Sequence, residues 1–461
     1  MDLPRKARTR RPRSRVVASF DAHASSFRLR ALSGILLVLV AGGACRAAWS
    51  TGSPGNASPP GPPCTPGSQV ACHCFGGETG VQVCSGDGAS FGPCVCQDAG
   101  ASDGGILRDP LLQPFAPTSI WNMPIGSKAE YVAANIAPLT RSALQGDEDI
   151  IILSPSSPST PVFKNPAGWD NSVSRCPYNM GGLLFDVPMP SSFIVGDTPV
   201  SSTPNAALAA LAADGRTLRQ TQPFARCTAG EPATSEYVAA SIDLYGDGTV
   251  GAHGGSGLSS IGGTLRLGEL RPGGPLVRHA LKAELFGEQN YYNDGVPADC
   301  YRWPATRCDG PIAQVLGPLD GAPNPGKYYG GSNPSLRPGS LLAIPANVSV
   351  ANLALETEPA RSLAWTLQNY GAYVVDDSGW PSMNLCVEAG PSGSFKDQFA
   401  SDWGFSFNTD GTTSPFARDI LAIVSALSIV DNNDPSSVGG GGAPLQPLAA
   451  PLPPGPPGAD D

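Results

Sequence analysis

Short apolar runs separated by turns dominate the chain from residue 106 onward. They lie at 150–153, 182–187, 218–224, 241–245, 276–286, 341–344 and 372–375. Most of these runs have the length of a β-strand rather than that of a helix. Asp-Gly dipeptides begin at Asp214, Asp247, Asp309 and Asp410, and this dipeptide is a strong turn signal. The pattern predicts many strands joined by tight turns.

Three segments carry helix signals instead. Thr203-Pro204 precedes an alanine-rich segment at 206–213, and Ser414-Pro415 precedes an amphipathic segment at 416–427. Proline at the first helical position is a start signal. The apolar residues of 358–370 recur with the period of a helix. We therefore predict a mainly β domain of the β-sandwich or jelly-roll type with a few short helices.

The first 45 residues have the composition of an export signal. Basic residues come first, an apolar run follows at 32–40, and small residues lead to Cys45. This order is typical of a secretory signal peptide, and the run is shorter than the roughly 20 residues that span a bilayer. Small residues directly before Cys45 also suit lipoprotein processing. Three outcomes stay open: a cell-surface or outer-membrane lipoprotein attached through a lipid on Cys45, a plainly secreted protein, or an uncleaved anchor.

Composition divides the rest of the chain into four parts. Residues 46–63 are rich in Pro, Gly and Ser and predict an extended linker. Six cysteines within 64–96 predict a small disulfide-rich module, because so short a unit cannot hold together through apolar burial alone. The main domain is expected at 106–434. The Gly- and Pro-rich segment 435–461 is expected to be a disordered tail.

The Cys-rich module has the order Cys64, Cys72-His73-Cys74, Cys84, Cys94-Val95-Cys96. This order resembles a Cys-rich repeat near the N-terminus of many myxobacterial surface proteins, which implies a surface location and no particular chemistry. Its disulfide connectivity stays open. Zinc binding by this module is the alternative, but zinc sites favour Cys-x2-Cys spacing and an exported chain is oxidised. We therefore expect no metal.

Charge narrows the range of partners. The leader holds 9 basic and 2 acidic residues, so the net charge of −10 for the whole chain becomes −17 for the part after residue 45. A chain so acidic repels nucleic acid and anionic surfaces. The sequence therefore excludes a nucleic-acid partner and disfavours a polyanionic substrate.

Five cysteines remain in the main domain. Cys300 and Cys308 flank a short loop and are expected to pair. Cys176 and Cys227 are the second expected pair. Cys386 lies inside an apolar run and is then expected to be a buried free thiol.

The main domain has two histidines, His253 and His279. His253 lies among glycines, where the backbone can approach a ligand closely, so we consider it a substrate-binding candidate; a polar residue of a hairpin is the alternative. On a strand, His279 shares a face with Val277 and Leu281. It is either a core residue or a catalytic one.

Aromatic and charged residues crowd the segment after His279. The candidates there are Tyr292, Asp294, Tyr301, Arg302, Trp303 and Arg307. Sugar rings stack on Trp and Tyr while charged groups bind their hydroxyls. We therefore consider Tyr301 a catalytic candidate and the others substrate-binding candidates, with an aromatic β core as the alternative.

Catalytic carboxylates are harder to choose, because the domain has many. Asp243, Glu269, Asp294 and Asp376 are the candidates for an acid and a base or nucleophile, and a glycosidase needs two that face each other. The segment that begins at Asp243 lacks the alternating oxygen ligands of a calcium loop. A His-Glu-x-x-His zinc motif is also missing from the sequence. We expect no metal and no other cofactor.

Several segments of the main domain resemble a widespread group of secreted bacterial proteins. They are Phe115-Ala-Pro-Thr-Ser-Ile-Trp121-Asn122-Met-Pro-Ile125, Gly268-Glu269-Leu270, His279-Ala280-Leu281, Trp303-Pro304-Ala305 and Leu367-Gln-Asn-Tyr-Gly-Ala-Tyr-Val-Val-Asp376. The resemblance covers most of 110–432 and implies an extracellular domain without a stated activity. It also implies that certain residues form one constellation. These are Trp121, Asn122, Glu269, His279, Tyr301, Trp303 and Asp376.

Two functions fit these features. The first is an extracellular enzyme that acts on polysaccharide. It would be a glycoside hydrolase with two carboxylates, or a lyase in which His279 or Tyr301 removes a proton and Arg302 or Arg307 neutralises the substrate carboxylate. The second is a non-catalytic, glycan-binding or adhesive surface lipoprotein. Convergent catalytic groups would favour the enzyme, and a flat aromatic face would favour the binding protein.

Overall fold

The computed structural model describes residues 69–73, 79–83, 107–170, 172–197, 205–294, 296, 299–308 and 329–457. The expectations for the signal peptide, Cys45, the linker 46–63 and most of the Cys-rich module lie outside these residues. Within the module, β1 (Gln69–His73) and β2 (Thr79–Val83) pair antiparallel. Across the described ranges, no helix combines the length and apolar character that a bilayer crossing requires.

The prediction of a mainly β protein with few helices is confirmed, since strands hold 24% of the interpretable residues and helices 14%. Most strands belong to one large sheet. In spatial order they are β10 (Tyr237–Val238), β8 (Thr217–Gln222), β7 (Leu208–Leu211), β4 (Leu144–Ile152), β15 (Met383–Gly390), β12 (Leu281–Leu285), β14 (Ala372–Asp377), β13 (Leu341–Ala343), β17 (Ser428–Val430) and β3 (Tyr131–Ala133), with β11 (Ile242–Asp243) beside β8 and β16 (Gly393–Ser394) beside β15. A second sheet has the order β6 (Leu183–Pro188), β5 (Ser159–Lys164) and β9 (Ala233–Ser235).

The large sheet mixes parallel and antiparallel pairs at its centre. Strand β4 runs parallel to both β7 and β15, β15 runs antiparallel to β12, and β12 runs parallel to β14. These central strands are therefore hydrogen-bonded on both edges. Both faces of the sheet are covered here as well. Polar residues on these strands must therefore find partners inside the protein.

The helices are α1 (Gly287–Asn290), α3 (Glu358–Asn369), α4 (Phe395–Trp403) and α5 (Pro415–Ala426), with 3-10 turns η2 (Val350–Leu353) and η3 (Val438–Gly440). The helices expected at 358–370 and 416–427 are confirmed. The segment 206–213 is not a helix, because its residues 208–211 form β7 between β4 and β8. All four residues of β7 are buried, and pairing in the middle of the sheet outweighs the high helix propensity of its alanines.

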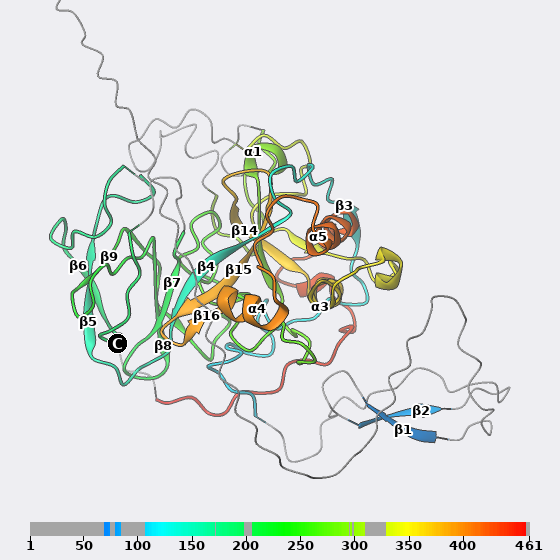
Figure 1. The fold of residues 1–461 in the computed structure, drawn as a ribbon, viewed down its shortest axis with the longest axis horizontal. Coiled ribbons are helices and arrows are strands. Elements are labelled where there is room, and N and C mark those ends of the chain that lie inside the picture. The colour runs from blue at the N-terminus through cyan, green and yellow to red at the C-terminus, as the bar shows by residue number, and fades with distance from the viewer. Residues whose placement is uncertain are drawn as a thin grey trace, which may run out of the picture. The chain divides into compact units, whose positions relative to one another are not determined.

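Helices α3, α4 and α5 cover one face of the large sheet (Figure 1). That face is apolar, and Leu281, Ala283 and Leu385 of the central strands pack there with the helices. The other face is covered by the loop segments around Trp121 and Leu258, which form a second apolar cluster with Tyr373 and Val375. Between this cover and the sheet lies a polar layer, which is described below.

Segment 435–457 is not the disordered tail that its composition predicts. Its backbone bonds to the segment that begins the main domain: Gly126 N donates to Gly439 O at 2.9 Å, and Leu445 N donates to Ile125 O at 2.8 Å. Glycine suits this close packing, because a Cβ on Gly440 would lie 2.5 Å from the Cα of Ala129. The glycines that look like low complexity in the sequence thus allow one backbone to lie directly against another.

The disulfide predictions for the main domain are confirmed. Cys176 bonds to Cys227, and Cys300 bonds to Cys308. Cys386 is free and buried, as expected.

Truncation after Asp434 should lower the free energy of unfolding by about 2–4 kcal/mol, because it removes four or more backbone hydrogen bonds worth about 1 kcal/mol each. Truncation after Ala450 is the matched control. It keeps the contacts of Gly439 and Leu445 and should cost clearly less. Urea denaturation of the three chains measures the difference. A chain ending at Asp434 that is as stable as the full chain would contradict the packed tail.

Candidate functional site

A cluster of ionisable side chains lies against the loop-covered face of the large sheet. Its members are Asp147, Asp149, His253, Lys282, Glu284, Asp376 and Cys386. All of them except Asp147 are at most 4% exposed, and Asp147 is half-buried. Burying so many charged groups is costly unless they are paired, so each of these side chains should have a partner within the protein.

Strand register brings these residues together. Asp147 and Asp149 of β4, Lys282 and Glu284 of β12, and Asn384 and Cys386 of β15 each lie two positions apart, so each pair shares one face of its strand. In the register, Cys386 is opposite Asp147, and Glu284 is opposite Asn384. A bulge between β12 and β14 also places Glu284 opposite Asp376, which turns that carboxylate toward the cluster.

His253 reaches the cluster from the covering loop. The glycines after it are required by close contact: a Cβ on Gly255 would lie 2.5 Å from Oδ1 of Asp376. The Gly254 N–H donates to Oε1 of Gln222 at 2.8 Å. The glycine-rich sequence around His253 therefore lets the loop press the imidazole onto the sheet.

A buried ion pair forms one end of the cluster. Lys282 Nζ lies 2.7 Å from Asp149 Oδ2 and 3.0 Å from the carbonyl oxygen of Ser259. The hydroxyl of Thr264 donates to the same carboxylate oxygen at 2.6 Å. Burial alone would raise the pKa of Asp149, but the charge of Lys282 holds it below its usual value.

His253 lies between two carboxylates. Its Nδ1 is 3.3 Å from Asp376 Oδ2, and its Nε2 is 3.4 Å from Asp149 Oδ1. Burial and the nearby Lys282 lower the pKa of His253, but the two carboxylates outweigh them and raise it to about 8. Asp376 thus holds the imidazole from its Nδ1 side, and Nε2 points toward the rest of the cluster.

The carboxyl groups of Asp147 and Glu284 interact directly. Burial, the charge of Asp147 and that of Asp376 raise the pKa of Glu284 well above its usual value, and burial also raises the pKa of Asp147. Asn384 Nδ2 donates to Glu284 Oε2 at 2.9 Å, and Asn205 Nδ2 donates to Asp147 Oδ2 at 3.1 Å. Two carboxyl groups so close together oppose each other's ionisation.

Cys386 lies at the centre of the cluster. Its Sγ is 3.4 Å from His253 Nε2 and 3.8 Å from Glu284 Oε1. The order Cys386, His253, Asp376 is that of a nucleophilic triad, but the surroundings oppose thiolate formation. Burial is the main cause that raises the pKa of the Cys386 thiol well above its usual value, and the negative charge of Asp149 raises it further. In the absence of a cation, the thiol is a poor nucleophile.

The cluster also contains a set of potential metal ligands. Asp147, His253, Glu284 and Cys386 each offer one donor atom, and these atoms all lie within 4.8 Å of one another. Zinc and related transition metals bind carboxylate, imidazole and thiolate groups, and all three types are present here.

The half-buried Asp147 is the least buried member of the cluster. Its partner Asn205 is half-buried and accepts hydrogen bonds from Trp169 Nε1 at 3.1 Å and from Gln222 Nε2 at 3.2 Å. Gln222 pairs across the sheet with Tyr237. The guanidinium of Arg307 lies 4.1 Å from the centre of the Tyr237 ring. We refer to Trp169, Tyr237 and Arg307, all half-buried, as the aromatic rim.

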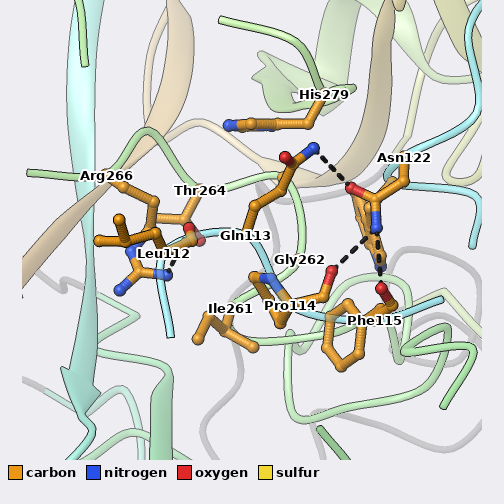
Figure 2. A pocket seen from close by; sticks show the side chains of 12 residues that line it. Leu112, Gln113, Pro114, Phe115, Asn122, Ile261, Gly262, Thr264, Arg266 and His279 are labelled. Carbon is orange, nitrogen blue, oxygen red and sulfur yellow. Dashed lines mark hydrogen bonds between the residues drawn. The ribbon is translucent and has the colours of Figure 1, made fainter. Parts of the chain in front are cut away.

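Four of the predicted site residues meet at a second place. His279, Trp121 and Asn122 line a cavity of about 20 Å³, which has room for about one water molecule. Figure 2 shows Gln113 beneath His279, with its amide bonded to Asn122 at 3.0 Å. Glu269 Oε1 lies 3.0 Å from His279 Nε2. Trp121 is buried, and its Nε1 donates to the Gly248 carbonyl at 2.8 Å.

His279 is bonded through both ring nitrogens, since Nδ1 lies 2.9 Å from the carbonyl oxygen of Ala280. Burial lowers its pKa, but the charge and hydrogen bond of Glu269 outweigh burial and raise it. Both ring nitrogens are therefore occupied by oxygen partners within the protein. The geometry is that of a structural ion pair next to a small cavity.

The remaining candidates are dispersed. Arg216 pairs with Asp243 at 2.6 Å, and Arg302 pairs with Asp431 at 3.0 Å. Asp294 accepts a hydrogen bond from the Val296 N–H at 2.9 Å. Three aromatic candidates have structural contacts: Tyr292 lies beneath the guanidinium of Arg337, and Tyr301 and Trp303 pack against the two apolar clusters.

The candidate residues thus fall into separate groups. His253 and Asp376 join the buried cluster, Arg307 joins the aromatic rim, and the pair of His279 and Glu269 lies elsewhere with Trp121 and Asn122. Sequence reasoning missed Asp147, Asp149 and Lys282 entirely. The signal in β12 was a charged residue at every second position between apolar ones, and in β4 it was the acidic run Asp147-Glu148-Asp149. Both patterns are usual for a solvated strand face.

Comparison of the chain with family models, with curated proteins and with solved structures found no match.

Substitution of Lys282 by Met should lower the free energy of unfolding by about 3–5 kcal/mol, because it leaves the Asp149 carboxylate buried without its cation. The double variant Lys282→Met/Asp149→Leu should recover more than half of this loss, since it removes the stranded charge as well. Thermal and urea denaturation of both variants measure the effect. A double variant no more stable than the single one would contradict the importance of this pair.

The pair of His279 and Glu269 should make stability depend on pH. The folded-state pKa of His279 is raised from 6.5, so the stabilisation is complete below pH 6.5 and is lost as the pH rises through the raised value. Glu269→Gln should flatten this dependence and shift the imidazole titration, followed by NMR, to lower pH. Glu288→Gln, at an exposed position, is the control. An unchanged titration in Glu269→Gln would contradict the assignment.

Proposed function

We propose that this protein is an exported enzyme that acts on polysaccharide, with the buried ionisable cluster as its catalytic centre. The observation that carries the proposal is the convergence of carboxylates, an imidazole and a thiol from four strands and one loop beneath a half-buried carboxylate. Such a cluster costs stability, and groups with strongly perturbed pKa values gather at functional sites.

The aromatic rim supports a carbohydrate substrate. Trp169 is linked to Asp147 through Asn205, and Tyr237 lies opposite Gln222 in the sheet. Arg307 stacks on Tyr237. Aromatic rings stack on the C–H faces of sugars, and guanidinium groups donate to their hydroxyls. A polymer lying along this rim would bring one of its linkages to the side of the cluster where the half-buried Asp147 lies.

Between the two reactions, the geometry favours hydrolysis over elimination. The lyase needs His279 or Tyr301 as a free base. Both nitrogens of His279 are engaged with oxygen atoms, and Tyr301 packs against an apolar cluster. Hydrolysis instead needs groups that activate water and polarise the leaving oxygen. Acidic groups and an imidazole held by Asp376 are present together in the cluster.

The alternative proposal is a non-catalytic protein that binds glycans through its surface. The aromatic rim would serve such a protein equally well, but the cluster would then have only a structural role. Substitutions in the cluster therefore separate the two proposals.

Export and surface attachment complete the proposal. The two disulfides of the main domain are of the kind that persists in oxidising compartments. A lipid on Cys45 would attach the protein to a membrane, and the linker 46–63 would separate the enzyme from that membrane.

A panel of polysaccharides, assayed for new reducing ends and for ultraviolet absorbance of unsaturated products, tests the function. We expect reducing ends without absorbance. Asp147→Asn and Glu284→Gln should each reduce the rate by about 100-fold or more. Glu148→Gln is the matched control, because Glu148 lies next to Asp147 on the opposite strand face, where it pairs with Lys396 at 2.8 Å.

Retention of glycans without turnover, unchanged in Asp147→Asn and Glu284→Gln, would favour the binding protein. Unsaturated products would contradict hydrolysis and favour a lyase.

A further inference from the structure

We infer that Asp147, His253, Glu284 and Cys386 hold one divalent transition-metal ion of the zinc type. The inference deepens the proposed function, because it assigns a cofactor to the same cluster, but it stands on contacts of its own. It departs from the sequence expectation of no metal, which considered the Cys-rich module, a calcium loop at Asp243 and a His-Glu-x-x-His motif.

The donor atoms are spaced as ligands of one ion are. Zinc bonds of roughly 2.0–2.3 Å in tetrahedral geometry place donor atoms about 3.3–3.8 Å apart. Cys386 Sγ lies 3.4 Å from His253 Nε2 and 3.8 Å from Glu284 Oε1. The four donor atoms, including that of Asp147, lie within 4.8 Å of one another, so small side-chain rotations bring all of them to one centre.

The residues around the four donors are arranged as an outer shell. A metal-bound histidine usually donates its other ring N–H to a carboxylate, which fixes its orientation. Here Asp376 lies 3.3 Å from Nδ1 of His253, and Nε2 faces Cys386. The side-chain amide of Asn384 orients the carboxylate of Glu284, and that of Asn205 orients the carboxylate of Asp147. Each of these donors therefore already has the partner that a metal site requires.

The charge of the cluster also calls for a cation. Four carboxyl groups and a thiol gather there, and the ion pairs that the structure describes within the cluster involve two basic side chains, Lys282 and His253. Asp149 Oδ1 is buried and has no hydrogen-bond partner, although it lies 3.4 Å from His253 Nε2. A divalent ion would neutralise the carboxylates and convert the thiol to a thiolate ligand.

The ligand types select among metals. Calcium and magnesium take oxygen ligands, whereas a thiolate together with an imidazole favours zinc, cobalt or iron. His253, Glu284 and Cys386 are almost completely buried, and of the four donors Asp147 alone is half-buried. The side of the ion that accepts a water molecule or substrate would therefore be the side of Asp147, facing the aromatic rim.

Titration of the chelator-treated full chain with Co²⁺ tests the site, because cobalt replaces zinc and reports a thiolate ligand by charge-transfer absorption. We expect one strongly bound Co²⁺ with this band, displaced by Zn²⁺ but not by Mg²⁺. Cys386→Ser should remove the band, Glu284→Gln should weaken binding, and Asp376→Asn should weaken it by about 10–100-fold. Glu148→Gln should leave both band and affinity unchanged. Circular dichroism verifies that each variant is folded.

Two results would overturn the inference. One is the absence of strong Co²⁺ and Zn²⁺ binding by the unmodified chain. The other is a charge-transfer band that persists in Cys386→Ser, which would locate the metal at other cysteines. Metal binding without activity on any polysaccharide would contradict the proposed substrate alone. Hydrolysis that survives removal of all metal would contradict the assignment of the ion as a cofactor, but not the proposed substrate.

Discussion

The buried ion pair between Lys282 and Asp149 is the constraint on which the rest of the cluster depends. It lets β4 and β12, the two strands on either side of β15, carry charge on a face that the loop around His253 then covers. With that pair in place, His253 lies against Asp149 and Asp376, and the remaining acids meet around Cys386. A polar layer inside a sheet is stable only when nearly all its members have partners, which explains why glycines, amides and hydroxyls from distant segments converge there.

Much of the architecture followed from local pattern. The mainly β class, the amphipathic helices α3 and α5, both disulfides of the main domain and the buried thiol of Cys386 were predicted, because each depends on residues close in sequence or on simple pairing of cysteines. The exceptions have physical reasons. The alanines of β7 take strand geometry because β4 and β8 enclose them, and the glycines of 435–445 serve close backbone packing rather than disorder.

The site was predictable only in part. His253 was a candidate because of its glycine neighbours, and Asp376 because it follows an apolar run. Lys282 and Asp149 could not be identified, since the alternating charges of β12 and the acidic run of β4 describe an exposed strand face as well as a buried polar layer. Which of these applies is decided by the order of strands and by the covering loop, and both depend on contacts between residues more than 100 positions apart.

The central claim is that the cluster is a functional centre built around a cation. Anomalous X-ray diffraction from crystals of the zinc-loaded protein, measured on both sides of the zinc absorption edge, tests it most directly. The account predicts one strong peak between Cys386 Sγ, His253 Nε2 and the carboxylates of Asp147 and Glu284. A map without a peak there, with Asp147 and Glu284 still in direct contact, would contradict it and leave the cluster a structural polar layer.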